Sequence, residues 1–275
     1  MKKTIAILLA LTLLLGLCAC GKTSAQTETA TTITTVETTT AATTKAAETT
    51  TAAETTTTAE TQGDTGGAGK VGPVDDGYWY DVERQEGDYT DSAGNQYHYV
   101  YAIPAFNASS ADASTLNSEI ETFCNQYIVE MKESMEGSSS LMTLSVDYKA
   151  FLNGDIASIL VIVEGDADLW SYGVFNLNIS TGNLADGAAL IAAAGLSEAD
   201  FVTAAQNAAS EKYKELYKSF QNDAFYDTQY QKTMSADEFG LDMPMYLGQD
   251  GKLYIVATIY SMAGAESYDY LLAVN

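Results

Sequence analysis

Few side chains in this chain of 275 residues could carry acid–base or nucleophilic catalysis. His98 is the only histidine, so a Ser-His-Asp or a Cys-His arrangement would have to use it. It lies among tyrosines in a stretch that alternates like a strand, and the sequence around it carries no recognisable nucleophile motif. Cys124 follows Phe123 on an apolar helical stripe, which favours packing over reactivity. These residues predict a chain that is not an enzyme.

Carboxylates are numerous, with 37 Asp and Glu against 13 Lys and Arg, so chance pairs of them are uninformative. Residues 164–168 offer alternating oxygens of the kind that Ca²⁺ favours, but the glycine and the closing Glu of an EF-hand loop are missing at their offsets. A solvated acidic turn is the better interpretation, and whether Ca²⁺ binds near Asp166 and Asp168 stays open. We expect no metal site, because the sequence beyond residue 20 offers no paired cysteines and no complete calcium loop. We also expect no cofactor, since no phosphate-binding glycine loop is present.

Tyrosine is the unusual enrichment of this chain, with 18 residues. Exposed tyrosines offer contact area at low entropic cost, which suits protein partners and carbohydrate rings alike. The alternative is that the rings fill half-buried positions in sheets, where aromatic residues are common. The candidate ligand-binding residues are Tyr97, Tyr99, Trp170, Tyr260 and Tyr268.

The N-terminus predicts export and a lipid anchor. A basic start precedes an apolar run over residues 5–17, which is shorter than the roughly 20 residues of a spanning helix and is typical of a signal peptide. The Leu-Cys-Ala-Cys that follows resembles the lipobox of bacterial lipoproteins, in which the last cysteine is acylated and becomes the mature N-terminus. We therefore expect residues 1–19 to be a signal peptide and Cys20 to carry the lipid, facing the extracellular side of the cell membrane. A plain signal peptide and an uncleaved anchor are the alternatives.

The next segment, residues 20–69, predicts a disordered linker behind the lipidated N-terminus. About half of residues 23–61 are Thr, with Ala and Glu filling most of the rest, and four glycines follow. Such a segment has too few apolar residues to offset the entropy of ordering it. A flexible chain of this length has a reach of about 40 Å, so it could hold a following domain away from the membrane. Whether its threonines are glycosylated stays open.

Residues 70–275 predict one acidic domain. It carries nine Lys or Arg against 31 Asp or Glu, a net charge of −22 with its histidine neutral. Such a surface repels nucleic acid and favours cationic partners, although solubility alone is the alternative explanation. Cys124 is its only cysteine, which excludes an intramolecular disulfide within the domain.

Hydrophobic periodicity predicts an α+β domain of mainly antiparallel sheets packed by two long helices. Residues 75–86 read as a lead-in strand or an irregular segment, and Pro104 should end the strand that begins at residue 96. The first long helix should be capped by Asp112 or Ser114 and end at Gly137. A short helix is expected over residues 188–194, and Ser197 should cap the second long helix, which runs to about residue 220. The strands expected are 96–104, 141–152, 155–164, 170–179, 243–247, 252–260 and 268–274.

The domain resembles the extracytoplasmic domains of RsiV-type anti-sigma factors, which are also appended to peptidoglycan deacetylases of the PdaC type. The family carries Asp where this chain has Asn176 and Lys where it has Asn183, so individual binding residues are not carried over. The motifs that carry the resemblance are Tyr101-Ala102-Ile103-Pro104, Leu116-Asn117-Ser118-Glu119-Ile120, residues 175–184, Gly251-Lys252-Leu253-Tyr254 and residues 259–264.

This resemblance implies a mixed sheet and helix module that acts as an extracellular sensor or binding domain, whose best understood member recognises lysozyme. The chain shows neither a second hydrophobic span nor a deacetylase motif, so binding is the function that we expect. The expected partners are the membrane, through Cys20, and a cationic protein such as lysozyme. Peptidoglycan is the alternative ligand, an uncharacterised enzyme is the third possibility, and nucleic acid is excluded.

Overall fold

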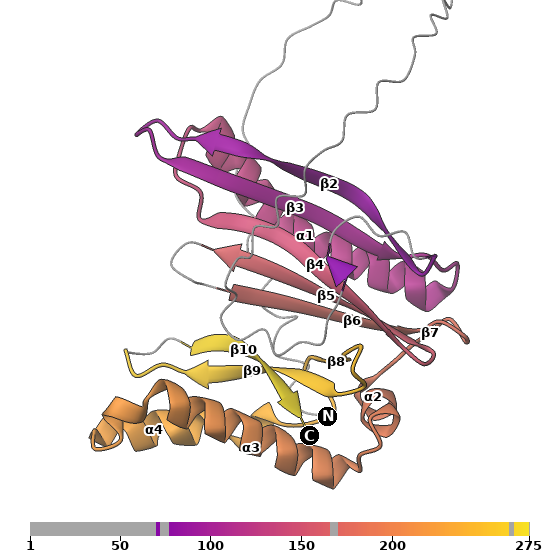
Figure 1. The fold of residues 1–275 in the computed structure, drawn as a ribbon, viewed down its shortest axis with the longest axis vertical. Coiled ribbons are helices and arrows are strands. Elements are labelled where there is room, and N and C mark those ends of the chain that lie inside the picture. Colours follow the sequence, from indigo (N-terminus) through magenta and orange to yellow (C-terminus); the bar gives the residue numbers. More distant parts are fainter. Residues whose placement is uncertain (1–69, 72–76, 166–169, 264–266, 275) are drawn as a thin grey trace, which may run out of the picture. The chain divides into compact units, whose positions relative to one another are not determined.

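The computed structural model describes residues 70–71, 77–165, 170–263 and 267–274. Its elements form a larger and a smaller sheet with helices, so the fold class is α+β, as the sequence predicted (Figure 1). In chain order they are β1 (Lys70–Val71), β2 (Trp79–Thr90), β3 (Gln96–Phe106), α1 (Ala111–Glu136), β4 (Thr143–Asn153), β5 (Ile156–Gly165), β6 (Trp170–Asn178), β7 (Asn183–Leu184), α2 (Gly187–Ala193), α3 (Glu198–Leu216), α4 (Ala224–Thr233), β8 (Met245–Leu247), β9 (Leu253–Tyr260) and β10 (Ser267–Val274), with 3₁₀ helices at Lys218–Phe220 and Ala236–Glu238.

The larger sheet has the strand order β2-β3-β4-β5-β6-β7, and β1 pairs with β4. Neighbouring strands are antiparallel except β3 and β4, which are parallel and pair only at Val100 and Tyr101. The expected turn between β4 and β5 contains Gly154 at a φ of +56°, a left-handed conformation that glycine adopts without strain. Since β7 pairs only with Leu177 and Asn178, the first part of β6 pairs with β5 alone among the described strands.

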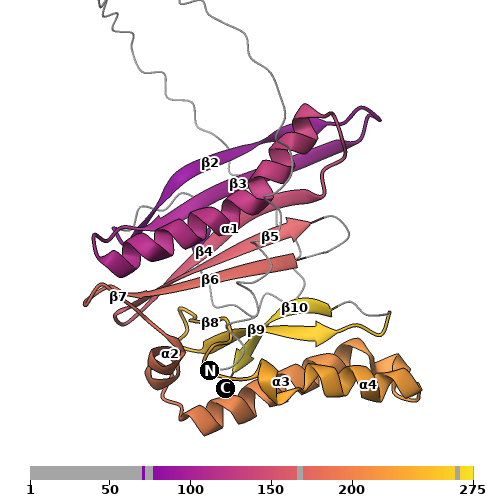
Figure 2. The ribbon, with the colours of Figure 1, turned by 180° about the vertical axis from the view of Figure 1, so that it is seen from behind.

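The smaller sheet is antiparallel, with the order β10-β9-β8 among the strands of the described ranges. The helices α2, α3 and α4 cover one face of it, on the side away from the larger sheet (Figures 1 and 2). The expected cap of α3 is present, because Ser197 accepts a hydrogen bond from the backbone N–H of Asp200. No single helix in the described ranges is both long enough and apolar enough to cross a bilayer; α2 and α3 pass that test only as a pair bent by 90°.

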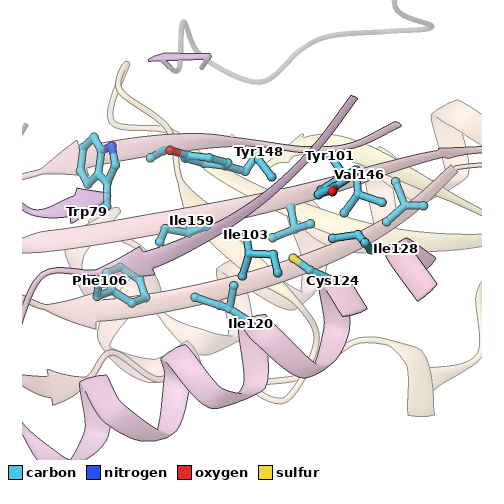
Figure 3. Close-up of a cluster of buried hydrophobic side chains, with 14 of the residues drawn as sticks. Trp79, Tyr101, Ile103, Phe106, Ile120, Cys124, Ile128, Val146, Tyr148 and Ile159 are labelled. Carbon is cyan, nitrogen blue, oxygen red and sulfur yellow. The ribbon is translucent and has the colours of Figure 1, made fainter. Parts of the chain in front are cut away.

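One face of the larger sheet packs against α1 (Figure 2). Figure 3 shows Ile120, Cys124 and Ile128 on this helix among sheet residues. Each of these three side chains is at most 1% exposed, and burying an aliphatic side chain of this size contributes about 1.5–3 kcal/mol. The side-chain amide of Asn117 accepts from the backbone N–H of Phe106 at 2.7 Å and donates to its carbonyl at 3.0 Å, which fixes α1 to the end of β3.

The opposite face of the larger sheet packs against the smaller sheet. Phe151 and Leu160 of the larger sheet form a buried cluster with Tyr246 and Tyr254 of the smaller one. The side chain of Asn176 is also buried there; it accepts a hydrogen bond from Ser158 at 2.6 Å and donates one to the carbonyl of Met245 at 2.9 Å. This amide joins the two sheets by a polar contact inside an otherwise apolar layer.

Two details of the prediction are wrong. The N-cap of α1 is Ser110, not Asp112 or Ser114. The helix begins two to four residues earlier than those caps imply, and the carboxylate of Asp112 instead accepts from the backbone N–H of Leu184 at 2.8 Å. Pro104 does not end its strand: it pairs with Asp81, beside a register irregularity of β2, where a missing proline N–H costs little. The segment expected as a lead-in strand or an irregular segment does form a strand, β2, which begins at Trp79 and continues to Thr90.

The second long helix also differs from the prediction. The long helix α3 ends at Leu216, and a 3₁₀ turn and the separate helix α4 follow. Gly137 does cap the end of α1, although with a right-handed conformation; the left-handed residue is Ser138, at a φ of 53°. The expected turn before β9 is present, with Gly251 at a φ of +77°. These differences leave the two-sheet arrangement unchanged.

Candidate functional site

A groove of about 770 Å³ lies between β6, α3 and β10. We call it the β10 groove, because six consecutive residues of that strand line it. Figures 1 and 2 show β10 on the side of the smaller sheet that faces β6. The lining residues are Trp170, Tyr172, Ala208, Glu211, Lys212, Glu215, Leu216, Tyr268, Asp269, Tyr270, Leu271, Leu272 and Ala273.

The lining residues of β10 come from both faces of the strand. Tyr270 and Leu272 pack with the cluster of the helices α2–α4, whereas Leu271 and Ala273 pack with the cluster between the two sheets. Successive side chains of a strand point to opposite faces, so a cavity lined by all of them must run along the edge of the strand. The β10 groove therefore follows the edge of β10 that faces away from β9.

The wall formed by α3 is predominantly acidic. Glu211 and Glu215 are exposed and one helical turn apart, so both lie on the same face of α3. Lys212 is the one Lys or Arg among the described lining residues; its ammonium lies 3.3 Å from the carboxylate of Glu215 and 5.2 Å from the ring centroid of Tyr270. Burial raises the pKa of Tyr270, and the nearby Tyr217, Tyr268 and Glu215 raise it further. Negative charge therefore exceeds positive charge on this wall.

The opposite wall is aromatic. Trp170 and Tyr172 lie two residues apart on β6, so their rings project from the same face of the larger sheet. Both are half-buried. The indole Nε1 of Trp170 is shielded from solvent and has no hydrogen-bond partner among the described residues, which costs about 1–3 kcal/mol for a buried donor. On the same side, Asp269 of β10 accepts a hydrogen bond from Thr258 at 2.8 Å.

Two of the five candidate ligand-binding residues meet in this groove, Trp170 and Tyr268. The other three lie elsewhere. Tyr99 is 9% exposed, stacks on Tyr101 beneath α1 and accepts a hydrogen bond from Gln85 at 2.9 Å.

The remaining two candidates are half-buried. Tyr97 stacks on Tyr89 and donates to Asp91 at 3.3 Å. The ring of Tyr260, at the end of β9, lies 5.5 Å from the ammonium of Lys232. The lipidation candidate, Cys20, lies outside the described residues.

The lone histidine sits between two carboxylates on an exposed part of the larger sheet. His98 Nε2 lies 3.2 Å from Glu86 and its Nδ1 lies 3.0 Å from Asp88. The hydrogen bond to Asp88 raises the pKa of His98, and the charge of Glu86 adds to this effect. This environment favours the imidazolium form, which cannot act as a general base.

The other groups considered for chemistry give no site in the described part of the chain. Cys124 is fully buried, and burial raises the pKa of its thiol to about 12, so the thiol stays protonated. No group of three or more His, Cys, Asp or Glu residues is arranged to hold a metal ion within the described ranges. Asp166 and Asp168 lie outside those ranges, so the question of Ca²⁺ there is untouched.

Several groove residues were missed by sequence reasoning. Glu211 and Glu215 carry a readable signal, because acids at a spacing of four on the polar side of a helix share a face. Tyr172 and Tyr270 each lie two residues from a candidate that was named, on the same face of the same strand. Nothing in the sequence indicates that β6, α3 and β10 meet, since these elements are far apart along the chain.

No family model and no curated protein matches the chain. Among solved structures, it is similar to the crystal structure of a member of the DUF3298 family from Bacteroides fragilis, with 10% sequence identity and a TM-score of 0.34. The similarity covers 76% of this chain and 91% of that chain. A likeness this distant assigns neither a function nor a site.

Proposed function

We propose that the chain is a lipid-anchored binding or sensor protein on the extracellular side of the membrane, whose domain takes a cationic protein ligand in the β10 groove. Lysozyme is the candidate that the sequence resemblance suggests. Cys20 supplies the anchor in this proposal, and the groove supplies the binding site. The role is binding without turnover.

The observation that carries this proposal is the combination of acidic and aromatic walls in one groove. Glu211, Glu215 and Asp269 provide carboxylates, and only Lys212 opposes them among the described lining residues. Carboxylates form charge-assisted hydrogen bonds with Lys and Arg. The faces of Trp170 and of the groove tyrosines attract the same cations, by about 0.5–2 kcal/mol each. Both walls therefore favour the same ligand chemistry.

The charge of the whole domain supports the same partner. A net charge of −22 over residues 70–275 produces a field that speeds encounter with a basic protein. Such steering weakens as salt is added, because the screening length falls to roughly 8 Å at physiological ionic strength. The proposal therefore requires both affinity and association rate to fall between low and moderate salt.

The test is calorimetric titration of the domain with lysozyme at low and moderate salt. The double variant Glu211→Gln/Glu215→Gln should weaken binding by about 2- to 30-fold at low salt, from about 0.2–1 kcal/mol for each exposed ion pair. Glu130→Gln is the matched control, since Glu130 is an exposed acid on α1, away from the groove. Lysozyme as the ligand is excluded if no association is detected at either salt concentration.

A second measurement, tryptophan fluorescence, tests whether the ligand lies in the groove. The described residues include two tryptophans, Trp79, which is 2% exposed, and Trp170. The tryptophans of lysozyme contribute equally to both titrations, so binding in the groove should change the fluorescence more for the wild type than for Trp170→Phe. Equal changes for the two proteins would place the ligand elsewhere.

Cell-wall polysaccharide is a second candidate, and the aromatic wall favours it. Rings such as those of Trp170 and Tyr172 can stack on sugar rings, while neighbouring carboxylates accept hydrogen bonds from sugar hydroxyls. These contacts depend little on ionic strength. A pull-down with purified peptidoglycan that persists at high salt and is lost in Trp170→Phe would support this candidate over the cationic protein.

A further inference from the structure

We propose that the outer edge of β2, the end strand of the larger sheet, binds an extended basic segment of a partner polypeptide, which adds to that sheet as a further strand. No residue of β2 lines the β10 groove, so this surface is a second one, and the inference does not depend on the proposed function. Basic side chains at alternate positions of the added strand would meet Glu86 and Asp88.

The outer edge of β2 has no strand beside it among the described strands. The strand comes first in the order of the larger sheet and pairs with β3 alone, and Figures 1 and 2 show it at one end of that sheet. Every residue of β2 after Trp79 is exposed or half-buried. At every second residue, an end strand directs an N–H and a C=O away from its neighbour. An extended peptide can continue the ladder on such an edge.

The part of this edge from Glu83 onward is regular. The register irregularity of β2 lies between Asp81 and Glu83, and the eight residues from Glu83 to Thr90 then pair one-to-one with β3. Such an irregularity bends a strand and discourages pairing along its edge, so an added strand should avoid residues 79–82. The regular part spans about 27 Å at 3.4 Å per residue, which exceeds the usual strand length of five to six residues. It is therefore long enough to hold an added strand.

Two carboxylates on the regular part are open to a ligand. Glu83 already has a cation beside it, since the ammonium of Lys132 lies 3.2 Å away. The side chains of Glu86 and Asp88 are 63% and 92% exposed, and His98 is the one described residue that forms ion pairs with them. Because these two acids are two residues apart, they project from the same face of the strand. Lys or Arg residues at the same spacing on an added strand would lie opposite both.

The other face of the edge favours an apolar ligand residue between the two basic ones. Gly87 lies between the two acids and pairs with Tyr99 of β3. The ring of Tyr99 covers this glycine, since a Cβ there would lie 2.9 Å from the Tyr99 hydroxyl oxygen. A ligand residue opposite Gly87 would share a face with this ring, and cross-strand neighbours of an aromatic ring are favourably apolar or β-branched. The preferred ligand pattern is therefore basic, apolar, basic.

The same charges disfavour a second copy of this chain as the occupant. Arg84 is the one Lys or Arg on the regular part, and it is already paired with Asp81 at 2.9 Å and with Asp147 at 2.7 Å. Like charges on facing strands are destabilising, and each domain carries a net charge of −22. Acids on an end strand are a common protection against self-association. A basic segment meets no such repulsion.

The test compares two peptides of the same composition by calorimetric titration with the detergent-solubilised full-length protein. One peptide of about seven residues alternates Lys and Val, as the period of a strand requires, and the other carries the same residues in two blocks. We expect the alternating peptide to bind at least tenfold more tightly. Glu86→Gln/Asp88→Asn should weaken its binding by about 2- to 30-fold. The matched control is Glu130→Gln/Glu133→Gln, which removes two exposed acids from α1 and should leave the affinity unchanged.

Methylation of the peptide backbone separates strand pairing from charge attraction. The N–H groups of a strand point alternately to its two sides, so methylating the Lys nitrogens and methylating the Val nitrogens block different edges. One of these two versions should lose the tenfold preference and the other should keep it. Equal affinities of the two methylated versions would contradict strand addition.

Hydrogen exchange locates the added strand. Binding of the alternating peptide should slow the exchange of alternate amides between Glu83 and Thr90. Unchanged exchange in β2, or no detectable binding of either peptide, would overturn the inference while leaving lysozyme binding in the β10 groove open to its own test. Weakening by Glu211→Gln/Glu215→Gln instead of Glu86→Gln/Asp88→Asn would move the peptide to the groove and would also overturn it. A concentration-dependent dimer that protects the same amides without peptide would assign the edge to self-association.

Discussion

The ammonium of Lys212 lies over the ring of Tyr270, 5.2 Å from its centroid, and so places the single described cation of the β10 groove between its acidic wall and its strand. The same ammonium lies 3.3 Å from a carboxylate oxygen of Glu215. It therefore neutralises one of the two acids that α3 contributes. Removing the charge of Lys212 should therefore affect the binding of a cationic ligand in the opposite sense to removing the charges of Glu211 and Glu215.

Lys212→Gln should strengthen the binding of a cationic ligand. The substitution removes a like charge from the groove and releases Glu215, and an exposed pair of this kind is worth about 0.2–1 kcal/mol, or roughly 1.4- to 5-fold in affinity. The gain should shrink with added salt. Calorimetric titration with lysozyme measures it, and Lys214→Gln, an exposed change on the same helix outside the groove lining, is the control. Weaker binding by Lys212→Gln would contradict the charge argument.

Asn176→Asp should destabilise the fold. The amide nitrogen of Asn176 donates to the carbonyl of Met245 in a buried layer, and a carboxylate has no hydrogen to give. The expected loss is about 1–3 kcal/mol, and more when the new group is charged. Since burial would raise the pKa of the new carboxyl, the loss should grow from pH 4 to pH 7.

The control for this change lies two residues away. Asn178 uses its side-chain oxygen to accept from the backbone N–H groups of Ser180 and Thr181 and from the Ser180 hydroxyl, roles that an aspartate keeps. Asn178→Asp should therefore leave the urea midpoint nearly unchanged at both pH values. Equal midpoints for Asn176→Asp and the wild type at pH 7 would show that the contact with Met245 is dispensable.

The ionised carboxylate of Asp91 should stabilise the fold at neutral pH, and this stabilisation should be lost at low pH. Its carboxylate accepts hydrogen bonds from the backbone of Ala93 and Asn95 and from the side chains of Asn95, Tyr97 and Ser140. The side-chain hydrogen bond from Asn95 is the largest cause that lowers the pKa of Asp91 to about 2. A carboxyl with a depressed pKa stabilises the fold above its ordinary pKa of about 3.9 and loses that effect as pH falls toward about 2.

Asp91→Asn should accordingly lower the free energy of unfolding at pH 7. The difference in this free energy between the variant and the wild type should become smaller as the pH falls from 4 to 2. Denaturant titrations at a series of pH values measure this difference. Asp155→Asn, at an exposed turn position, should give a difference that is small throughout. A difference for Asp91→Asn that does not depend on pH would mean that the charge of the carboxylate contributes nothing.

Much of the fold could be predicted because its elements carry strong local signals. Alternation identified most strands of both sheets, and the stripe of apolar residues through Ile120 and Ile128 identified α1. The errors arose where tertiary contacts override local preference. Asp112 is a good capping residue by type, but its carboxylate instead accepts a hydrogen bond from the backbone N–H of Leu184 in β7. Pro104 is tolerated because β2 is irregular where the two strands pair.

The candidate site could be predicted only in part. Tyrosine enrichment and acidity pointed to a binding surface, and two named residues, Trp170 and Tyr268, do line the groove. Composition does not indicate which aromatic residues are buried in the sheets. Tyr99, for example, was expected to bind a ligand but is buried. The groove itself depends on the packing of two sheets and one helix, which no local pattern encodes.

Cys20→Ser should release the protein from the membrane. Acylation of Cys20 would supply two chains, each stabilising attachment by about 0.8 kcal/mol per buried CH₂, and two chains are what stable anchoring requires. A serine cannot form the thioether, so the variant should move from the detergent phase to the aqueous phase on temperature-induced separation and should lose incorporation of labelled fatty acid. Cys18→Ser is the matched control, because Cys18 precedes the cleavage position in the same motif and should leave partitioning unchanged. A Cys20→Ser variant that stays in the detergent phase would place the membrane attachment outside the lipobox.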